Sequence, residues 1–277
     1  MVKVSVIILT YNHEKWIDDA IASVLNQSIS NEIEVIIHDD CSTDQTLTKA
    51  LQWRDRHPDI IRVISPKENS WSKKQFERRI ISIMNEDTRG TYIALLEGDD
   101  YWGDGDKLRK QTLFLDSNHE FAMCFHNVNL VSESGEFLSE LIPHRLRKDY
   151  SAIALRRFNY AYIHLNSLCF RNYKLELPEE AFLSRNGDMF LPFAYGAHGG
   201  AKFLSDVLPS CYRQTSHGVW AGISPMQKNI NKFQTKLLIA SCLLTTGDTK
   251  FALAILSQEI IPVANELLAS LPDRNLN

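Results

Sequence analysis

Two groups of carboxylates directly follow apolar runs in this 277-residue chain. One run ends at Asp39–Asp40, and the other ends at Glu97–Asp100, which contains Glu97, Asp99 and Asp100. Adjacent carboxylates repel one another and aspartate fits poorly inside strands, so a positive charge is expected close to them. Carboxylate oxygens are ligands for hard divalent cations. Asp99 and Asp100 are therefore predicted to hold a divalent metal ion, which would also neutralise a bound diphosphate.

A third group of polar residues, Thr10-Tyr11-Asn12, follows the first apolar run. A dinucleotide-binding fold would carry GxGxxG here, and a P-loop enzyme would carry GxxxxGK[ST], but the sequence contains neither motif. Thr10 and Asn12 can bond a base or ribose, and Tyr11 can stack. Either Asp39 or Asp40 can accept a hydrogen bond from a base N–H.

Simpler structural roles compete with these interpretations. An Asp-Asp pair at a strand end is often part of a loop or a helix cap. Asp44 suits the first turn of a helix, and Asp104 and Asp106 can cap the helix that follows them. Two such pairs in the same context, without a glycine motif, favour a functional site.

Strand and helix signals alternate over the first ~115 residues, and this alternation must position the three polar groups. It predicts a parallel sheet covered by helices, with the ligand beyond the carboxyl ends of the strands. Strands are expected at 3–10, 34–40, 60–65 and 91–98, and helices at 13–27, 42–57, 73–87 and 106–118.

The second half has a mixed pattern. Strand signals at 121–132 and 136–141 flank a hairpin turn, and further strands are expected at 161–171 and, as two short strands, within 201–214. Residues 187–199 read as helical despite Pro192, and the pattern after Ser224 is helical. We therefore place a boundary near Gly222, between a main domain of residues 1–222 and a helical extension of residues 223–277.

Composition limits the function classes. A net charge of −4 argues against nucleic acid as the main partner, and five scattered cysteines suit a reduced environment better than a disulfide framework. No signal peptide is recognisable at the N-terminus, and no apolar run reaches the ~20 residues of a membrane span. A cytoplasmic location is expected, with peripheral contact at the inner face of the membrane as a further option.

Four segments together resemble the inverting glycosyltransferases of family 2, which have the GT-A fold. They are VSVIILTYNHEKWIDDAIASVLNQ, EVIIHDDCSTDQT, GTYIALLEGDDYWGDGDKLRKQ and SRNGDMFLPFAYGAHG. The second resembles the DDGSTDGT element of that family, with Cys41 in place of the usual glycine. The resemblance covers roughly residues 3 to 220. It implies a GT-A domain, a Rossmann-like α/β fold with a mostly parallel central sheet flanked by helices.

The resemblance also implies roles for individual residues. Thr10, Tyr11 and Asp39 would line the base pocket, with Asp39 facing the base N–H. Asp99 would contact the ribose or the metal, and Asp100 would be the metal ligand, with Mn²⁺ or Mg²⁺ as cofactor. The donor would be a nucleotide sugar, with UDP the expected nucleotide, and the acceptor a glycan or lipid-linked glycan in surface polysaccharide biosynthesis.

Asp188 would be the general base for the acceptor hydroxyl. The alternative is that Asp188 caps the helix that follows it.

The chain departs from the family pattern at two further places. The Asn-x-Gly turn after the third strand is replaced by Glu68–Trp71, so the phosphate contact falls to Lys73 or Lys74. The family's usual histidine position near the end is Thr215, and His217 is the candidate to replace it as a metal or phosphate contact.

Two other functions stay open. Nucleotidyltransferases also use strand-end aspartates and a metal, although their Gly-rich basic loop is missing here. A catalytically inactive module that binds sugar nucleotides or glycans would tolerate Ser70 and Thr215. Basic stretches such as Arg78–Arg79 and Arg156–Arg157 read as solvated helix faces, or alternatively as a patch for anionic lipid headgroups.

Overall fold

A computed structural model describes residues 1–73, 76–157, 163–184, 186–215 and 222–269. Its centre is a seven-stranded sheet with strand order β3-β2-β1-β4-β8-β5-β9. The strands are β1 (Val4–Thr10), β2 (Ile33–Asp39), β3 (Ile61–Ile64), β4 (Tyr92–Glu97), β5 (Phe121–Phe125), β8 (Cys169–Arg171) and β9 (Gly200–Phe203). Strands β3, β2, β1 and β4 are parallel, while β8 runs antiparallel to β4 and β5. The predicted α/β class with a mostly parallel sheet is confirmed.

The strands nearest the middle of the sheet are buried on both faces. All seven residues of β1 are buried, and its side chains divide between two hydrophobic clusters. Ile7 and Leu9 belong to one cluster, and Val4, Val6 and Ile8 belong to the other. This two-sided burial explains why the parallel strands read as continuous apolar runs rather than alternating ones.

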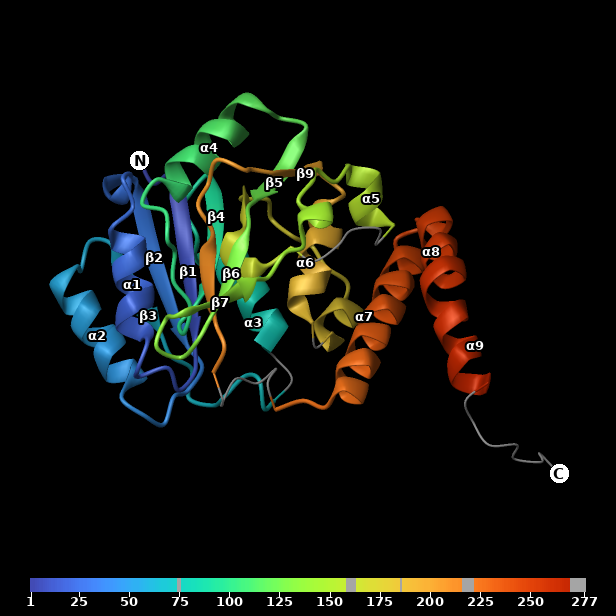
Figure 1. Ribbon diagram of the computed structural model, residues 1–277, viewed down its shortest axis with the longest axis horizontal. Coiled ribbons are helices and arrows are strands. Elements are labelled where there is room, and N and C mark those ends of the chain that lie inside the picture. The colour runs from blue at the N-terminus through green and yellow to red at the C-terminus, as the bar shows by residue number, and fades with distance from the viewer. Residues whose placement is uncertain (74–75, 158–162, 185, 216–221, 270–277) are drawn as a thin grey trace.

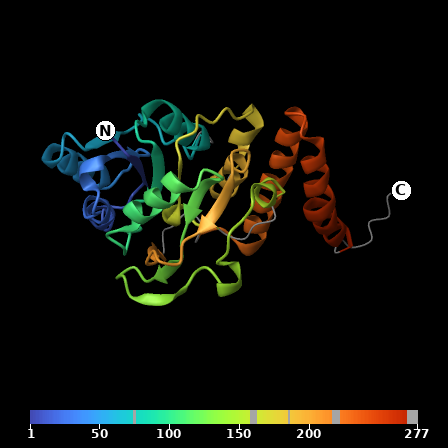
Figure 2. The ribbon, with the colours of Figure 1, turned by 90° about the horizontal axis from the view of Figure 1, so that it is seen from above.

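Helices cover both faces of the sheet, as Figures 1 and 2 show. The helices are α1 (Ile17–Leu25), α2 (Thr46–Arg56), α3 (Phe76–Ser82), α4 (Lys107–Ser117), α5 (Ala152–Arg156), α6 (Gly187–Tyr195), α7 (Pro225–Thr245), α8 (Thr249–Ile255) and α9 (Ile261–Ala269). The apolar face of α1, with Ile17, Ala20, Ile21 and Val24, packs into the second cluster. Short 3-10 or π segments lie at Ser30–Glu32, Ile83–Asp87, His144–Leu146, Leu165–Ser167, Glu179–Leu183 and Leu256–Ile260.

A second, three-stranded sheet lies beside the acidic segment that follows β4. It contains β6 (Val128–Val131), β7 (Phe137–Glu140) and β10 (Ser210–Arg213), in the order β10-β6-β7. Strands β6 and β7 are antiparallel and form the predicted hairpin, while β10 pairs with β6 in parallel. The segment predicted as one strand over 121–132 is thus split between the two sheets.

Two expectations about local structure were wrong in detail. Within the predicted strand 161–171, only Cys169–Arg171 is a strand among the described residues, because Leu165–Ser167 forms a 3-10 turn. The first residues of the predicted helix 42–57 form a loop, and α2 begins at Thr46. Asp44 lies just outside α2, where its Oδ1 accepts hydrogen bonds from the N–H and the hydroxyl of Thr46.

The C-terminal helices pack at the end of the molecule opposite β1–β3 (Figure 1). Helices α7 and α8 contribute Ile239, Leu243, Ala252 and Ile255 to the hydrophobic cluster that includes Ile7 and Phe170. The helical extension predicted after Ser224 is therefore present and shares its core with the main domain. No helix in the described part of the chain is long and apolar enough to cross a membrane.

Glu34 ties the start of β2 to its neighbours, and it provides a test of the fold. Its carboxylate is buried and accepts hydrogen bonds from Ser5 Oγ (2.6 Å), Arg89 N–H (2.6 Å) and Arg89 Nε (2.7 Å). We expect Glu34→Gln to lower the free energy of unfolding by about 1.5–3 kcal/mol, measured by urea denaturation. Glu120→Gln, at an exposed carboxylate, is the control.

The same bonds predict how this stabilisation depends on pH. Burial alone would raise the pKa of Glu34, but the bonds from Ser5 and Arg89 and the charge of Arg89 outweigh it, so the pKa lies below its ordinary value of 4.5. The contribution of Glu34 is therefore complete above the unfolded-state pKa and disappears as the pH falls through the lower folded-state pKa. An equal difference between wild type and variant at about pH 7 and about pH 3 would contradict this assignment.

Candidate active site

The carboxyl ends of β2, β1 and β4 lie side by side, as the sequence predicted. Thr10 pairs with Asp39 in the parallel register of β1 and β2, and Leu9 pairs with Glu97 in that of β1 and β4. The Asp40 N–H donates to the Thr10 carbonyl at 2.9 Å, and the Gly98 N–H donates to the Leu9 carbonyl at 2.8 Å. The three polar segments therefore converge on one edge of the sheet.

Thr10 and Asp39 present buried oxygens that lack a hydrogen-bond partner within the described residues. Thr10 is 4% exposed and Asp39 is 0% exposed, yet Thr10 Oγ1 and Asp39 Oδ1 are both unpaired there. The other carboxylate oxygen, Asp39 Oδ2, accepts from the Ser42 N–H at 3.0 Å. Because an unpaired buried oxygen costs about 1–3 kcal/mol, such a pair indicates a place prepared for a ligand.

Tyr11 and Asn12 border these oxygens at the surface. Tyr11 is 40% exposed, which leaves its ring available for stacking. Asn12 has a φ of 57°, and its side-chain oxygen accepts from the Thr43 N–H at 2.8 Å. Asn12 thus ties together the loops that follow β1 and β2.

Asp40 has a structural role in the loop that follows β3. Its Oδ1 accepts from the N–H (2.7 Å) and hydroxyl (2.6 Å) of Ser70, and its Oδ2 accepts from the Trp71 N–H (3.1 Å). Asp40 therefore holds the loop after β3, where the sequence departs from the family pattern. Of the two carboxylates, Asp39 is the one with an oxygen that has no hydrogen-bond partner among the described residues.

Cys41 adopts the left-handed conformation that explains the family's preference for glycine at this position. Its φ is 66°, and its N–H donates to the Asp39 carbonyl at 2.9 Å. Residues with a Cβ seldom adopt this conformation. The turn is therefore kept despite the substitution.

The acidic turn, which we define as Glu97–Asp100, begins at the end of β4. A Cβ on Gly98 would lie 2.6 Å from Thr10 Oγ1 and 3.0 Å from His13 Nδ1, so β1 and this turn approach closely only because residue 98 is glycine. Asp99 is 9% exposed, and its Oδ2 lies 3.7 Å from His13 Nε2. Asp99 is thus near enough to the end of β1 to reach the same ligand as Thr10.

Asp100 is completely buried inside the acidic turn. Its Oδ1 accepts from the Arg213 N–H at 2.9 Å, and its Oδ2 accepts from Asn166 Nδ2 at 2.8 Å. Burial, followed by the charges of Asp99 and Glu97, raises the pKa of Asp100 well above its usual range. A bound cation would favour the ionised form instead.

Glu97, Asp100 and His164 form a set of metal-ligand atoms. One ligand atom from each lies within 4.8 Å of the others. His164 is buried, and burial lowers its pKa to about 4, so its imidazole is neutral at physiological pH. Its Nδ1 accepts from the Asn166 N–H at 3.3 Å, so binding a metal would require the ring to give up this bond or its Nε2 proton. Two carboxylates and an imidazole suit Mn²⁺ or Mg²⁺, so the predicted cofactor fits these residues.

His164, which the structure brings close to Glu97 and Asp100, was not among the site residues predicted from the sequence. It lies just before β8, about 60 residues after the acidic turn, and β8 pairs with β4. In the sequence, His164 stands next to an apolar strand, and a histidine in that context is usually a core residue.

Arg213, at the end of β10, places a positive charge beside the acidic turn, where the sequence predicted one. Its Nε donates to the Asp99 carbonyl at 2.9 Å, its Nη1 to the Glu133 carbonyl at 2.7 Å, and its Nη2 to Asp19 Oδ2 at 3.0 Å. The guanidinium therefore stabilises the acidic turn through these hydrogen bonds, whether or not a metal is also bound there. This residue was also missed, because its partners come from three distant segments.

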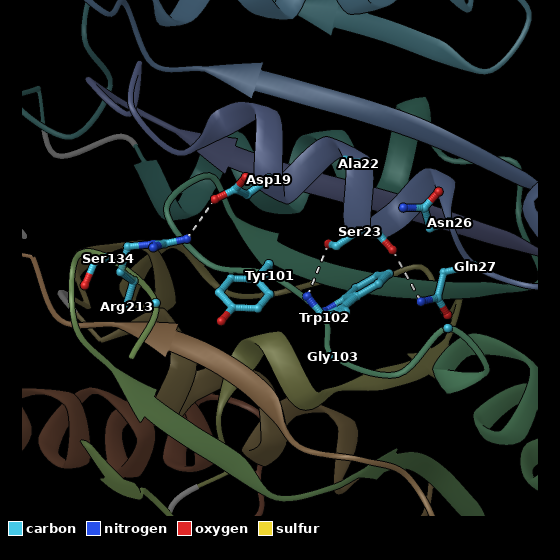
Figure 3. A pocket seen from close by; sticks show the side chains of 12 residues that line it. Asp19, Ala22, Ser23, Asn26, Gln27, Tyr101, Trp102, Gly103, Ser134 and Arg213 are labelled. Atoms are coloured by element: carbon cyan, nitrogen blue, oxygen red, sulfur yellow. Dashed lines mark hydrogen bonds and ion pairs between the residues drawn. The ribbon is translucent and has the colours of Figure 1, made fainter. Parts of the chain in front are cut away.

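A cavity of about 530 Å³ opens next to the acidic turn, between α1, the loop after Asp100 and the turn at 134–135. Figure 3 shows Asp19 of α1 directed at Arg213, to which it is bonded, and Ser23 of α1 directed at Trp102. Ser23 Oγ accepts from the Trp102 N–H at 3.2 Å. This cavity reaches Arg213 but not the unpaired oxygens of Thr10 and Asp39.

The remaining predicted site residues are less fully described. Lys74 and His217 lie outside the described residues. Asp188 is the second residue of α6, and its side chain also lies outside the described part. The N-cap of α6 is Asn186, so the alternative prediction that Asp188 caps this helix was wrong.

Comparison with known proteins agrees with this geometry. The profile of glycosyl transferase family 2 matches residues 5–170. An uncharacterized protein of Mycobacterium tuberculosis is 33% identical over 218 residues, which are 78% of this chain and 60% of the relative. The chain thus spans less than two thirds of the length of such relatives.

Two solved structures share the fold. The structure of TarS 1–349 from Staphylococcus aureus in complex with UDP matches with a TM-score of 0.64 and 22% identity, over 88% of this chain and 66% of that one. The mannosyltransferase PcManGT from Pyrobaculum calidifontis, in complex with GDP-Man and Mn²⁺, matches with a TM-score of 0.55 and 17% identity, over 96% and 79% of the chains. The GT-A fold expected from the sequence is confirmed, and the chain belongs to glycosyl transferase family 2.

Proposed function

We propose that the chain transfers a sugar from a nucleoside-diphosphate sugar, with UDP as the nucleotide, to a hydroxyl of a glycan or lipid-linked glycan, with inversion at the anomeric carbon. The observation that carries this proposal is the pair of unpaired buried oxygens, Thr10 Oγ1 and Asp39 Oδ1, at adjacent strand ends. Uracil carries an N3–H that can donate to the Asp39 carboxylate. The UDP complex of the structural neighbour TarS supports this choice of nucleotide.

The diphosphate would lie over the acidic turn. Asp100, together with Glu97 and His164, would hold Mn²⁺ or Mg²⁺ there, and His217 stays a proposed further contact. When bound, the ion supplies Lewis-acid stabilisation of the departing diphosphate. Asp99 would bind the ribose side of the donor, since it lies beside His13 near the end of β1, and Lys74 stays a proposed phosphate contact.

Asp188 would serve as the general base. The acceptor oxygen forms a bond to the anomeric carbon, the bond from that carbon to the diphosphate oxygen breaks, and the acceptor proton passes to the Asp188 carboxylate. The nucleoside diphosphate leaves with the electron pair of the broken bond. Attack opposite the leaving group inverts the configuration.

A role in surface polysaccharide biosynthesis follows from the same proposal. The relative TarS is named a poly(ribitol-phosphate) β-N-acetylglucosaminyltransferase, which is a transferase acting on a polymer, and it is 29% identical over 120 residues. We propose cytoplasmic activity at the inner face of the membrane, with residues 1–222 as the transferase domain and 223–277 as the extension.

Asp39→Asn tests the proposed donor site. A charge-assisted hydrogen bond contributes about 1.5–3 kcal/mol, so UDP affinity measured by calorimetry should fall about 10–150-fold. Cytosine has no N3–H, so wild type should prefer UDP to CDP, and the variant should lose much of that preference. Asp55→Asn, at an exposed carboxylate that is bonded to Arg54, should bind UDP like wild type.

Two results would count against the proposal. Unchanged UDP affinity in Asp39→Asn would show that Asp39 does not contact the base. Saturable UDP binding without UDP release from any UDP-sugar in the presence of Mn²⁺ would instead support an inactive binding module.

A further inference from the structure

An apolar groove of about 420 Å³ lies apart from the cavity beside Arg213. We call it the Trp71 groove. Its apolar lining residues are Trp71, Phe182, Leu183, Leu237 and Leu238, and its polar ones are Glu77, Ser184 and Gln234. Leu183 is 67% exposed and Leu237 is 40% exposed, so apolar side chains remain uncovered at its rim. An exposed apolar groove of this kind is typical of a surface that binds a ligand or a partner.

One wall of the groove is fixed to the donor end of the sheet. The Trp71 N–H donates to Asp40 Oδ2 at 3.1 Å, and Asp40 directly follows Asp39. The loop after β3 therefore joins the proposed base pocket to the groove.

The opposite wall leads to the proposed general base. Ser184 also lines the groove, and its hydroxyl accepts from the N–H of Asn186, the N-cap of α6, at 3.2 Å. Asp188 is two residues beyond this cap. The groove thus lies between the donor end of the sheet and the start of α6, where the proposed function would place the acceptor.

The apolar surface continues out of the groove along α7. Met226 and Ile230 are 72% and 37% exposed, and the spacings of four and seven residues place them on the same face of α7 as Leu237. Figure 1 shows α7 beside α6. This arrangement suits a long, flexible apolar chain better than a compact ligand.

The positively charged side chain of Arg78 lies at the rim of the groove. The Arg78 guanidinium lies 4.4 Å from the centre of the Phe182 ring and is also bonded to the Glu179 carboxylate. Both partners of this ion pair are largely exposed, so it is weak, and a phosphate could compete with Glu179 for Arg78.

We propose that the Trp71 groove holds the apolar chain of a lipid-linked acceptor, so that the acceptor hydroxyl is presented at the start of α6. This inference rests on the proposed function, which it deepens by naming the acceptor class. The apolar lipid chain lies among Trp71, Phe182 and the leucines of the groove. The phosphate of the lipid carrier then lies near Arg78.

The test compares two probes with the same sugar, n-octyl β-D-glucopyranoside below its micelle concentration and methyl β-D-glucopyranoside. Binding to the full chain is measured by calorimetry. The octyl probe should bind saturably and at least about tenfold more tightly than the methyl probe, because it buries several methylene groups. Leu183→Ser/Leu237→Ser should weaken octyl binding about tenfold and leave UDP affinity unchanged.

The matched control is Leu208→Ser/Leu253→Ser, which replaces two leucines of similar exposure (59% and 57%) outside the groove. It should bind the octyl probe like wild type. Octyl binding that is unaffected by the groove variant, or equal binding of the two probes, would overturn the inference.

Two further results separate this inference from its premise. If UDP fails to bind wild type while octyl glucoside binds in the groove, the proposed function falls and the acceptor assignment with it. If the chain binds phosphatidylcholine vesicles through Leu183 and Leu237 but not the monomeric octyl probe, the groove docks on a membrane surface, and the acceptor-chain assignment is overturned.

Discussion

Asp188→Asn is expected to lower kcat by about 10²–10⁴-fold while leaving UDP affinity unchanged. The asparagine amide has nearly the same shape as the carboxylate but cannot take the proton of the acceptor hydroxyl. The measurement is UDP release with a donor and an acceptor, alongside calorimetric titration with UDP. A loss confined to kcat would identify an interaction that acts in the chemical step rather than in donor binding.

A structural role for Asp188 would give a different result. As the second residue of α6, its charge can stabilise the helix N-terminus by about 0.3–1 kcal/mol. If that were its main role, Asp188→Asn would lower the melting temperature and leave kcat near that of wild type. Asp206→Asn, at an exposed aspartate, controls for the general effect of removing one charge.

Asp100→Ala is expected to abolish metal-dependent turnover and to weaken Mn²⁺ binding at least about 100-fold, as measured by titration calorimetry. The variant also removes the acceptor of the Arg213 N–H and of the Asn166 amide, so its folding must be checked by its melting temperature. If the variant kept the metal dependence of wild type, Asp100 would not be a metal ligand.

His164→Gln tests the same site without removing those acceptors. The glutamine amide is a poor substitute for imidazole as a ligand, so Mn²⁺ affinity should fall about 10–100-fold while UDP affinity without metal stays the same. His126→Gln is the matched control, since His126 is another buried neutral histidine, whose pKa burial lowers to about 3, and is not in the ligand set. Equal losses in both histidine variants would indicate a packing effect rather than a metal ligand.

The local pattern of the sequence predicted most of the first half of the fold. Parallel strands such as β1 and β4 are buried on both faces, so they appear as unbroken apolar runs that are hard to mistake. The second half was harder, because 121–132 divides between two sheets and only Cys169–Arg171 of its region is a strand. Pairing partners decide such short segments, and these partners are distant in sequence.

The sequence by itself determined that Thr10, Asp39 and the acidic turn meet, since parallel neighbouring strands bring their carboxyl ends to one edge. Only the tertiary structure decided which atoms there remain available. It engaged Asp40 with the loop after β3 and brought Arg213 and His164 to the acids from remote segments. It also left an oxygen of Asp39 without a partner in the part of the chain that is described. The physical reason is that hydrogen-bond partners and ligand sets depend on distances in space, whereas strand ends follow from local periodicity.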